Sequence, residues 1–201
     1  MRVSRVQAAE NRQTVINVAS RLFRERGFDG IGLKDLMKGA GLTQGAFYKQ
    51  FASKDDLAAQ ASRRALESAA RRWSAAAEAN PKDPLGAVVA LYLSMGHRQE
   101  RMDGCPVVAL GSDAARQSVD VKASFEAGIK NYLEMLGRWI GDTDREDSTD
   151  RSMTILSTMV GALVLSRAVN NKRLSKRFLQ AAAKSVLMTS SASDAQQGSL
   201  Q

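Results

Sequence analysis

The residues with the clearest binding chemistry are gathered in one segment, GLTQGAFYKQFASKDDL, at positions 41–57. Hydroxyl, amide and ammonium side chains in this segment surround Phe47 and Phe51, which are four residues apart. Hydroxyl and amide groups can donate hydrogen bonds, and the two lysines add positive charge. We therefore interpret the segment as a binding surface for a partner that carries acceptors and negative charge.

Two other reactive side chains raise the alternative of catalysis. His97 is the only histidine and Cys105 the only cysteine, and they could form a thiol–base pair, while GSD at 111–113 offers a serine. The sequence has no nucleophile elbow and no glycine-rich phosphate loop, and one histidine with one cysteine cannot complete a zinc site. We predict that the protein is not an enzyme, and we expect neither a metal nor a cofactor.

Cys105 also suggests a sensor of reactive compounds. Pro106 suits the first position of a short helix, PVVALGSDAAR, which puts Cys105 near its N-cap. The positive potential at a helix N-terminus favours the thiolate, which could capture an oxidant or an electrophile. The alternative is that the thiol is a small packed hydrophobic group.

The composition indicates which elements must position these groups. Of 201 residues, 44% are hydrophobic, which is enough to form a core. Only three residues are proline and alanine is abundant, which favours helices. Apolar residues at helical spacing predict an all-α fold of about nine helices. Strand signals are nearly absent.

Three helices are expected to form the first part of the chain. The first carries an apolar stripe from Val15 to Phe23 and stops at Gly27, and the second follows Gly32. Gly41 closes the second helix, because glycine tolerates the positive φ of a sharp turn.

The third helix is expected to begin with Thr43 as its N-cap, the hydroxyl making the capping bond. Phe47 and Phe51 then face the first two helices, which leaves other side chains free to point outward: Gln44, Gly45, Tyr48 and Lys49. The order and lengths of these helices are those of a helix-turn-helix, whose last helix enters the DNA major groove. A glycine in its first turn would let the backbone approach DNA closely.

The charge distribution agrees with a nucleic-acid partner. The formal net charge is +8, and residues 1–52 hold nine Lys and Arg against four Asp and Glu. Neutralising phosphates and releasing counterions favours binding of such a block to nucleic acid. A solvated basic face is the alternative.

The rest of the chain is expected to be helical as well. Ser53 should cap a fourth helix that reaches about Glu78, NPKDP at 80–84 is a linker, and Asp83 with Pro84 begins a fifth helix continuing inward to Met95. The acidic segment 141–150 is expected to be a solvated loop. Two closing helices follow, the first apolar nearly all round, and the tail 190–201 is expected to be disordered.

The compartment is expected to be the cytosol. One cysteine fits a reducing environment, and the N-terminus lacks the apolar core of a signal peptide. The longest charge-free apolar-rich run, 152–166, is shorter than the roughly 20 residues of a membrane span.

The arrangement AGLTQGAFYKQFASKDDL, preceded by VASRLFRERGFDGIGLKDLMK, resembles the DNA-binding domain of the TetR family of bacterial transcriptional regulators. The resemblance covers residues 11–57, and beyond them it extends only to the all-helical layout. It implies that Gln44 and Lys49 face base edges, whereas phosphates are held by Thr43, Tyr48 and Lys54. Where family members often carry Thr and Ser, this chain has Ile31 and Gly32, and Lys34 could supply a replacement contact.

The resemblance also implies a domain organisation: a DNA-binding domain at 1–52, an effector-binding and dimerisation domain at 53–189, and the tail. Possible lining residues of an effector pocket are Trp73, Tyr92, Met95, His97, Cys105, Phe125, Tyr132 and Trp139, with ordinary core as the alternative. A helix that is apolar all round needs partners on both sides, so we expect the last two helices to form a two-fold dimer. The expected interface residues are Met159, Gly161, Ala162, Leu165, Phe178, Ala182 and Val186, with burial inside one subunit as the alternative.

We therefore predict a sequence-specific DNA-binding regulator, a homodimeric repressor released from a palindromic double-stranded DNA operator by a small molecule, an electrophile or an oxidant. The alternative is a nonspecific binder of nucleic acid or anionic surfaces, using NKRLSKR at 171–177 and the basic N-terminus.

Overall fold

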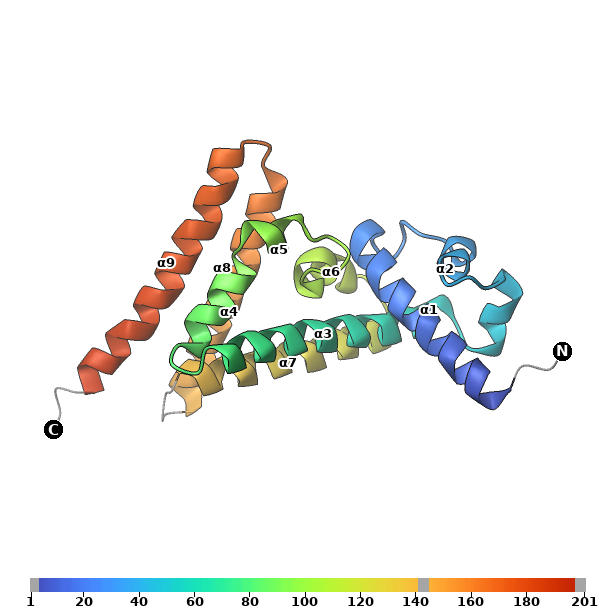
Figure 1. Cartoon of the computed structure of the whole chain (residues 1–201), viewed down its shortest axis with the longest axis horizontal. Coiled ribbons are helices and arrows are strands. Elements are labelled where there is room, and N and C mark those ends of the chain that lie inside the picture. The colour runs from blue at the N-terminus through green and yellow to red at the C-terminus, as the bar shows by residue number, and fades with distance from the viewer. Residues whose placement is uncertain (1–3, 141–144, 198–201) are drawn as a thin grey trace. The chain divides into compact units, whose positions relative to one another are not determined.

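The computed structural model describes residues 4–140 and 145–197, and it describes side-chain surroundings for 4–140 and 148–188. Within those residues there are nine α-helices, one 3-10 helix and no strand. The elements are α1 (Arg5–Arg26), α2 (Leu33–Gly39), the 3-10 helix η1 (Gln44–Lys49), α3 (Lys54–Ala79), α4 (Pro84–Tyr92), α5 (Met95–Gln99), α6 (Pro106–Ala114), α7 (Val119–Ile140), α8 (Arg145–Ala168) and α9 (Lys172–Gln197) (Figure 1). The predicted all-α fold is confirmed.

The chain divides into two compact units, each built from two separate stretches. The first unit comprises Met1–Ala69 and Arg101–Gly128, and the second comprises Ala70–Glu100 and Ile129–Gln201. Helices α3 and α7 each contribute residues to both units. The first unit thus contains considerably more of the chain than the segment 1–52.

The core of the first unit contains aromatic and aliphatic side chains of α1, α2, η1 and the segments that connect them. Phe23 and Phe28 have ring centroids 5.2 Å apart, and Phe47 stacks on Phe51 at 5.4 Å. Leu36 and Met37 of α2 are completely buried beside them. Helices α1, α2 and η1 therefore share one core, as the helix-turn-helix pattern predicts.

Arg24 joins the end of α1 to the segment that precedes α6. Its guanidinium is buried and donates to the carbonyls of Ser20 and Gly104, both at 2.9 Å. The carboxylate of Asp103 lies 3.8 Å from Arg24 and 3.1 Å from Arg21. The bond to Gly104 satisfies a backbone acceptor outside the helices, where no helical partner is available.

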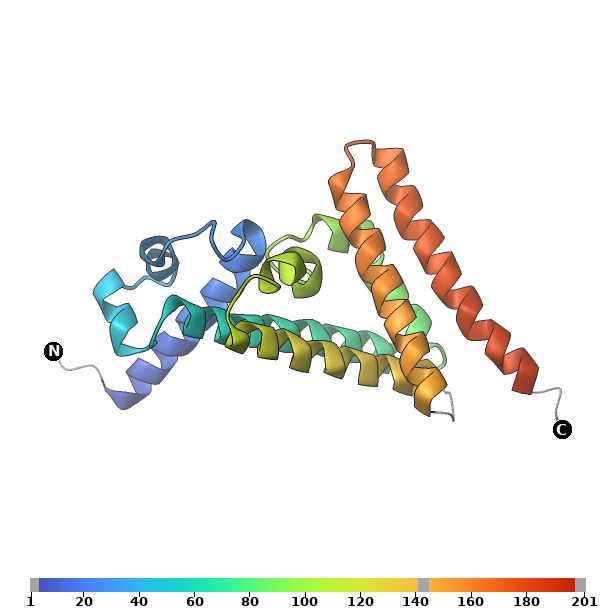
Figure 2. The same ribbon diagram turned by 180° about the vertical axis from the view of Figure 1, so that it is seen from behind.

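In the second unit, α8 and α9 form an antiparallel hairpin, which both views show (Figures 1 and 2). The hydroxyls of Ser166 and Ser175 lie 2.8 Å apart near its turn. Arg167 donates to backbone carbonyls at the end of α5, at 2.8–3.0 Å: those of His97, Arg98 and Glu100. The α8 end is therefore tied to α5 by hydrogen bonds as well as by packing.

Several expected helix starts are confirmed by their capping bonds. The amide of Asp56 donates to the Ser53 hydroxyl at 3.0 Å, while the Asp56 carboxylate accepts from the amide of Ala52 at 3.1 Å. Asp83 caps α4 by accepting from the amide of Gly86 at 2.8 Å. Such reciprocal bonds satisfy the free amides of a first turn.

Two predictions about helix boundaries in the first half of the chain are wrong. The third helix is a 3-10 helix, because only six residues separate its N-cap from its C-cap and 3-10 geometry suits such short pieces. The fifth helix does not continue to Met95. It ends at Tyr92, and the hydroxyl of Ser94 accepts from the amide of His97 at 3.0 Å to begin the separate helix α5.

Two predictions about the second half are also wrong. Residues 145–150 of the expected acidic loop are helical, since acidic residues are favourable in a first helical turn, while 141–144 lie outside the described residues. The expected disordered tail begins at 190, yet α9 continues to Gln197. No proline or glycine interrupts that stretch, and extending an existing helix costs little. Residues 198–201 are not described.

Candidate nucleic-acid interface

The turn before η1 has the geometry that the sequence predicts. Gly41 adopts φ of +71°, and the amide of Leu42 donates to the carbonyl of Met37 at 2.9 Å. A side chain at Gly41 would be strained in this left-handed conformation. The sharp reversal places η1 directly after α2.

Adjacent residues of η1 differ sharply in exposure. Phe47 is 0% exposed, whereas Tyr48 is 67% exposed, and their rings meet edge to face at 5.3 Å. The buried ring anchors η1 to the core of the first unit, which leaves the phenol hydroxyl of Tyr48 in solvent.

Four further residues form an exposed surface with Tyr48. We call this the η1 surface, and it consists of Thr43, Gln44, Gly45, Tyr48 and Lys49. A Cβ atom added at Gly45 would meet nothing within 4 Å. Close packing inside the protein therefore does not explain this glycine, and the surface presents hydroxyl, amide and ammonium donors around bare backbone.

Thr43 takes the N-cap position of η1 in an extended conformation, but its side chain makes no capping bond. The prediction that the hydroxyl caps the helix is wrong, although the position is right. A 3-10 turn presents its first amides differently from an α-helix, and the amide of Ala46 already bonds the carbonyl of Thr43 at 3.0 Å. The exposed hydroxyl is available to an external acceptor.

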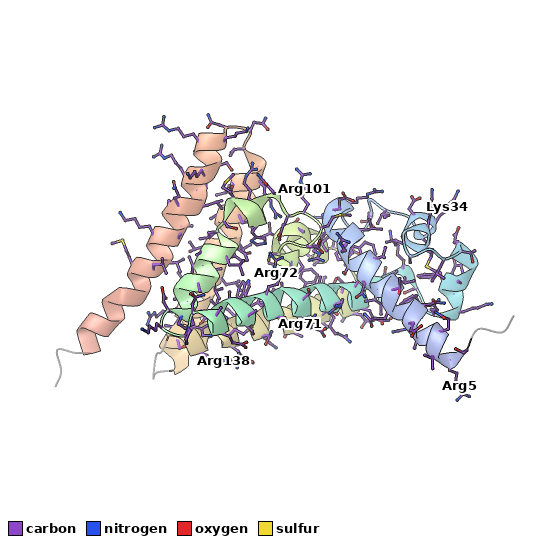
Figure 3. The ribbon with its side chains drawn as sticks, in the orientation of Figure 1. Arg5, Lys34, Arg71, Arg72, Arg101 and Arg138 are labelled. Carbon is purple, nitrogen blue, oxygen red and sulfur yellow. The ribbon has the colours of Figure 1, made fainter. Side chains whose placement is uncertain are left out.

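The other two predicted contact residues lie at helix starts. Lys54 is the first residue of α3 and is half-buried. Lys34 is the second residue of α2 and is exposed on it (Figure 3). Ile31, which stands where the family often has a hydroxyl, is 3% exposed and belongs to the core, while Gly32 is the N-cap.

Sequence reasoning missed Arg12 of α1. Its Nε donates to the carbonyl of Gln50 at 3.3 Å, and its guanidinium carbon lies 5.0 Å from the centroid of the Phe51 ring. Arg12 thereby holds the end of η1 from the side of α1. Its position one turn before buried Ile16 was a usable signal, but its backbone partner was not visible in the sequence.

Four of the predicted effector residues meet in the second unit. The Trp73 ring stacks on Tyr132 at 4.7 Å and meets Tyr92 edge-on at 5.5 Å, while Tyr92 meets His97 at 4.7 Å. All four side chains are buried. They form a continuous aromatic cluster within one unit.

Burial lowers the pKa of His97, and the neighbouring positive charges of Arg167 and Arg72 act in the same direction. The hydrogen bond to the carbonyl of Tyr92 and the charge of Glu100 oppose this shift. The distance from Nδ1 to that carbonyl is 2.7 Å. Because a carbonyl can only accept, Nδ1 carries the proton in this bond.

The remaining effector candidates do not join this cluster. Met95 and Trp139 are half-buried in the second unit, whereas Cys105 and Phe125 are buried residues of the first unit. Cys105 is the N-cap residue of α6, as predicted, and is 3% exposed.

The predicted dimer residues separate into buried and accessible positions. Four are buried within the chain and offer little surface to a partner: Met159, Ala162, Ala182 and Val186. Gly161 and Phe178 are half-buried, and Leu165 is 48% exposed. Burial inside one subunit, the alternative to a dimer contact, therefore describes these four residues.

Other apolar side chains of the same helices are exposed. We call them, together with Leu165, the α8–α9 surface: Met153, Val164, Leu165, Leu174 and Met188. Clusters of exposed large apolar residues are typical of protein-interaction sites. The small exposed residues Ser157 and Ala168 lie on the same helix, α8.

Two other kinds of feature are absent from the described residues. Among the described residues, no group of three or more His, Cys, Asp or Glu side chains could hold a metal ion. None of the described helices is long and apolar enough to cross a membrane.

Comparison with known proteins agrees with this geometry. The family model described as "Bacterial regulatory proteins, tetR family" matches residues 15–61. The transcriptional repressor NemR of Escherichia coli is 24% identical over 132 residues, or 64% of this chain and 66% of NemR, so the match spans just under two thirds of that protein. The transcriptional regulator LmrA of Bacillus subtilis is 23% identical over 81% of this chain and 89% of its own length. AcrR of Shigella flexneri is 41% identical over 56 residues, covering 28% and 26% of the two chains.

Solved structures share the fold over most of the chain. Reduced NemR from Escherichia coli superposes with a TM-score of 0.73 at 21% identity, covering 88% of this chain and 96% of that one. A TetR-family regulator from Cytophaga hutchinsonii gives 0.75 at 20% identity, covering 93% and 97%.

The helix-turn-helix with its exposed donors has the arrangement of a DNA-binding domain, and the family model that matches residues 15–61 is one of bacterial regulatory proteins. Residues 15–61 match the family model of the TetR regulators, and the resemblance of residues 11–57 to the DNA-binding domain of that family is confirmed.

Proposed function

We propose that the protein is a sequence-specific repressor that binds a palindromic DNA operator as a homodimer. The observation that carries the proposal is the η1 surface, in which donors surround Gly45 while Phe47 is wholly buried. Gln44 and Lys49 would read base edges, and Thr43, Tyr48, Lys54 and Lys34 would hold phosphates. An operator of this kind implies that the protein acts in the bacterial cytosol.

The α8–α9 surface supports the homodimer. A two-fold axis would bring the same apolar residues of two copies together, which buries surface that one chain leaves in water. Two η1 helices held at a fixed separation can then read the two halves of a palindrome.

The effector would act by favouring a conformation whose η1 helices have the wrong separation. Such an effector must bind the two conformations with different affinities. The aromatic cluster around Trp73 is one candidate for the binding site. Cys105 is the candidate for a signal carried by an electrophile or an oxidant, and NemR has been solved in a form described as reduced.

Selection of bound sequences from a random duplex pool tests the proposal. We expect an enriched palindrome, and the enriched DNA is then titrated with the wild-type protein and with Cys105→Ser, each with and without an electrophile. Release from the wild type alone would support the thiol signal, whereas release from neither would redirect the search to noncovalent ligands. Absence of any enriched sequence would overturn the specific-repressor proposal and favour the charge-driven binder.

A further inference from the structure

A polar groove in the first unit plays no part in the proposed function. It lies between α1 and the first half of α3 and has a volume of about 420 Å³. Its chemistry is set by Arg12 and Asn17 of α1, together with Gln60, Arg63, Arg64 and Glu67 of α3. The volume is within the range of small-molecule sites, which is roughly 300–1,000 Å³.

The groove carries an excess of positive charge that the protein itself does not neutralise. Three arginines line it against one glutamate. Within the described part of the chain, the ion pairs involve other residues, and no carboxylate lies within 4.0 Å of the nitrogens of Arg12, Arg63 or Arg64. Arginines gathered without counter-charges repel one another, so an anion bound among them relieves an existing cost.

Two of the guanidinium groups are fixed by hydrogen bonds from Nε to other groups of the protein. The Nε of Arg64 donates to the side-chain oxygen of Asn17 at 2.8 Å, and that oxygen also accepts from Gln13 at 3.1 Å. The Nε of Arg12 bonds the Gln50 carbonyl. Both arginines are thus fixed through Nε, while their terminal nitrogens make no hydrogen bond within the described residues. A fixed guanidinium loses less conformational entropy when it binds an oxyanion.

We propose that this groove is a binding site for a phosphate-bearing anion of about diphosphate size. Planar guanidinium groups donate paired hydrogen bonds that match phosphate oxygens, and charge-assisted bonds of this kind are the strong ones. Arg12 and Arg64 would hold the anion from the two helices, and Arg63 would add charge at the exposed edge. The anion would bridge α1 and α3.

Phosphate groups could come from two sources, the DNA backbone or a free phosphorylated compound. Arg12 also supports the end of η1, so a backbone phosphate at the groove would be continuous with the proposed DNA contacts. A free compound would instead bind whether or not DNA is present. Both sources present the same phosphate oxygens, and competition between DNA and the free anion distinguishes them.

The test is titration of the full-length protein with inorganic pyrophosphate by isothermal calorimetry at low salt. We expect one site per subunit, with affinity reduced at least about 10-fold in Arg63→Gln, a loss of about 1.4 kcal/mol. Arg63 makes no hydrogen bond within the described residues, so this variant is expected to fold normally, and Arg64→Gln serves as a second variant. Arg71→Gln is the matched control, because Arg71 is an exposed arginine of the same helix that does not line the groove (Figure 3).

Absence of pyrophosphate binding to the wild type would overturn the proposal, as would equal weakening by Arg63→Gln and Arg71→Gln. Repeating the titration with saturating duplex DNA of random sequence identifies the source. If DNA reduces pyrophosphate binding, and if Arg63→Gln but not Arg71→Gln lowers the salt dependence of DNA binding, the site binds backbone phosphate. If pyrophosphate binding is undiminished by DNA, the site binds a free compound. The pyrophosphate arm uses no operator, so its outcome is independent of the selection experiment.

Discussion

The η1 surface and the α8–α9 surface are both exposed, but they are made from opposite kinds of side chain. The first presents hydroxyl, amide and ammonium donors around an open glycine, and the second presents methionine, valine and leucine. Binding to the first should weaken steeply with salt, whereas binding to the second should depend on apolar area and little on salt. The two surfaces are thus suited to different kinds of partner, and we propose DNA for the first and a second copy of the chain for the second.

The largest expected effect comes from placing a charge in the α8–α9 surface. Leu165→Glu should weaken dimerisation by about 3 kcal/mol, roughly 100-fold, because the carboxylate would lose its water in an apolar contact. Sedimentation equilibrium measures the dimer dissociation constant. Val119→Glu, which alters an equally apolar but separate exposed site on α7, should leave it unchanged. Equal effects of the two variants would contradict the assignment of the surface.

A large side chain at position 45 should weaken DNA binding without unfolding the protein. Gly45→Leu is expected to reduce operator affinity by about 2 kcal/mol, because the side chain holds η1 away from the groove. The melting temperature should fall only slightly, since a Cβ there meets nothing. Fluorescence anisotropy with the selected duplex measures the affinity. Unchanged binding would show that this face of η1 does not approach DNA.

Within the η1 surface, substitutions of base-contacting residues and of phosphate-contacting residues should change DNA affinity in different ways. Gln44→Ala and Lys49→Ala should change which base is preferred, by about 1.5 kcal/mol for each lost contact. Tyr48→Phe should weaken all sequences alike, by about 1 kcal/mol, because it removes one hydroxyl bond to phosphate. Affinities for single-base variants of the selected operator check both. An unaltered base preference in the first two variants would show that the wrong side chains have been assigned to the groove.

The smallest effect is expected from a group that lies in neither surface. Burial lowers the pKa of His97, so the folded state takes up this proton less readily than the unfolded state, whose histidine titrates near 6.5. Stability is therefore full above that pH and falls as the pH decreases below it. The loss is at most about 1.4 kcal/mol per pH unit for one proton. Urea unfolding at pH 7.5 and 5.5 measures it, and His97→Gln should reduce the difference; the same dependence in the variant would exclude His97 as its source.

The helix-turn-helix was predictable because its signals are local. Gly41 follows from the need for a positive φ, and Phe47 of η1 and Phe51, just after η1, are both buried as their apolar character predicts. Whether the short helix has α or 3-10 geometry was not predictable, because six residues contain too few apolar positions to distinguish a period of 3.0 residues from one of 3.6.

The α8–α9 surface could be predicted only in part. Helix α8 is apolar nearly all round, so its sequence does not reveal which apolar residues the partner helix of the same chain covers. Met159 and Ala162 are buried within the chain, whereas the neighbouring Val164 and Leu165 remain exposed. Only the tertiary structure separates these two sets.

The backbone partners of the buried and half-buried arginines had no signal in the sequence. Arg12, Arg24 and Arg167 each donate to backbone carbonyls far along the chain. Every residue carries such a carbonyl, so no residue type identifies the partner. The break between α4 and α5 was not predicted either. Ser94 caps the start of α5, and Arg167 donates to the carbonyl of His97 in the same helix.

The discontinuous first unit has a consequence for modularity. Its two stretches, Met1–Ala69 and Arg101–Gly128, are separated by part of the second unit. A gene fragment ending after η1 would omit Leu57, Leu66 and the α6 segment that Arg24 holds, and would expose the core they cover. Exchange of the DNA-binding unit between relatives would therefore require two matched stretches of chain. A change of operator preference is expected to need fewer changes when it occurs by substitutions on η1.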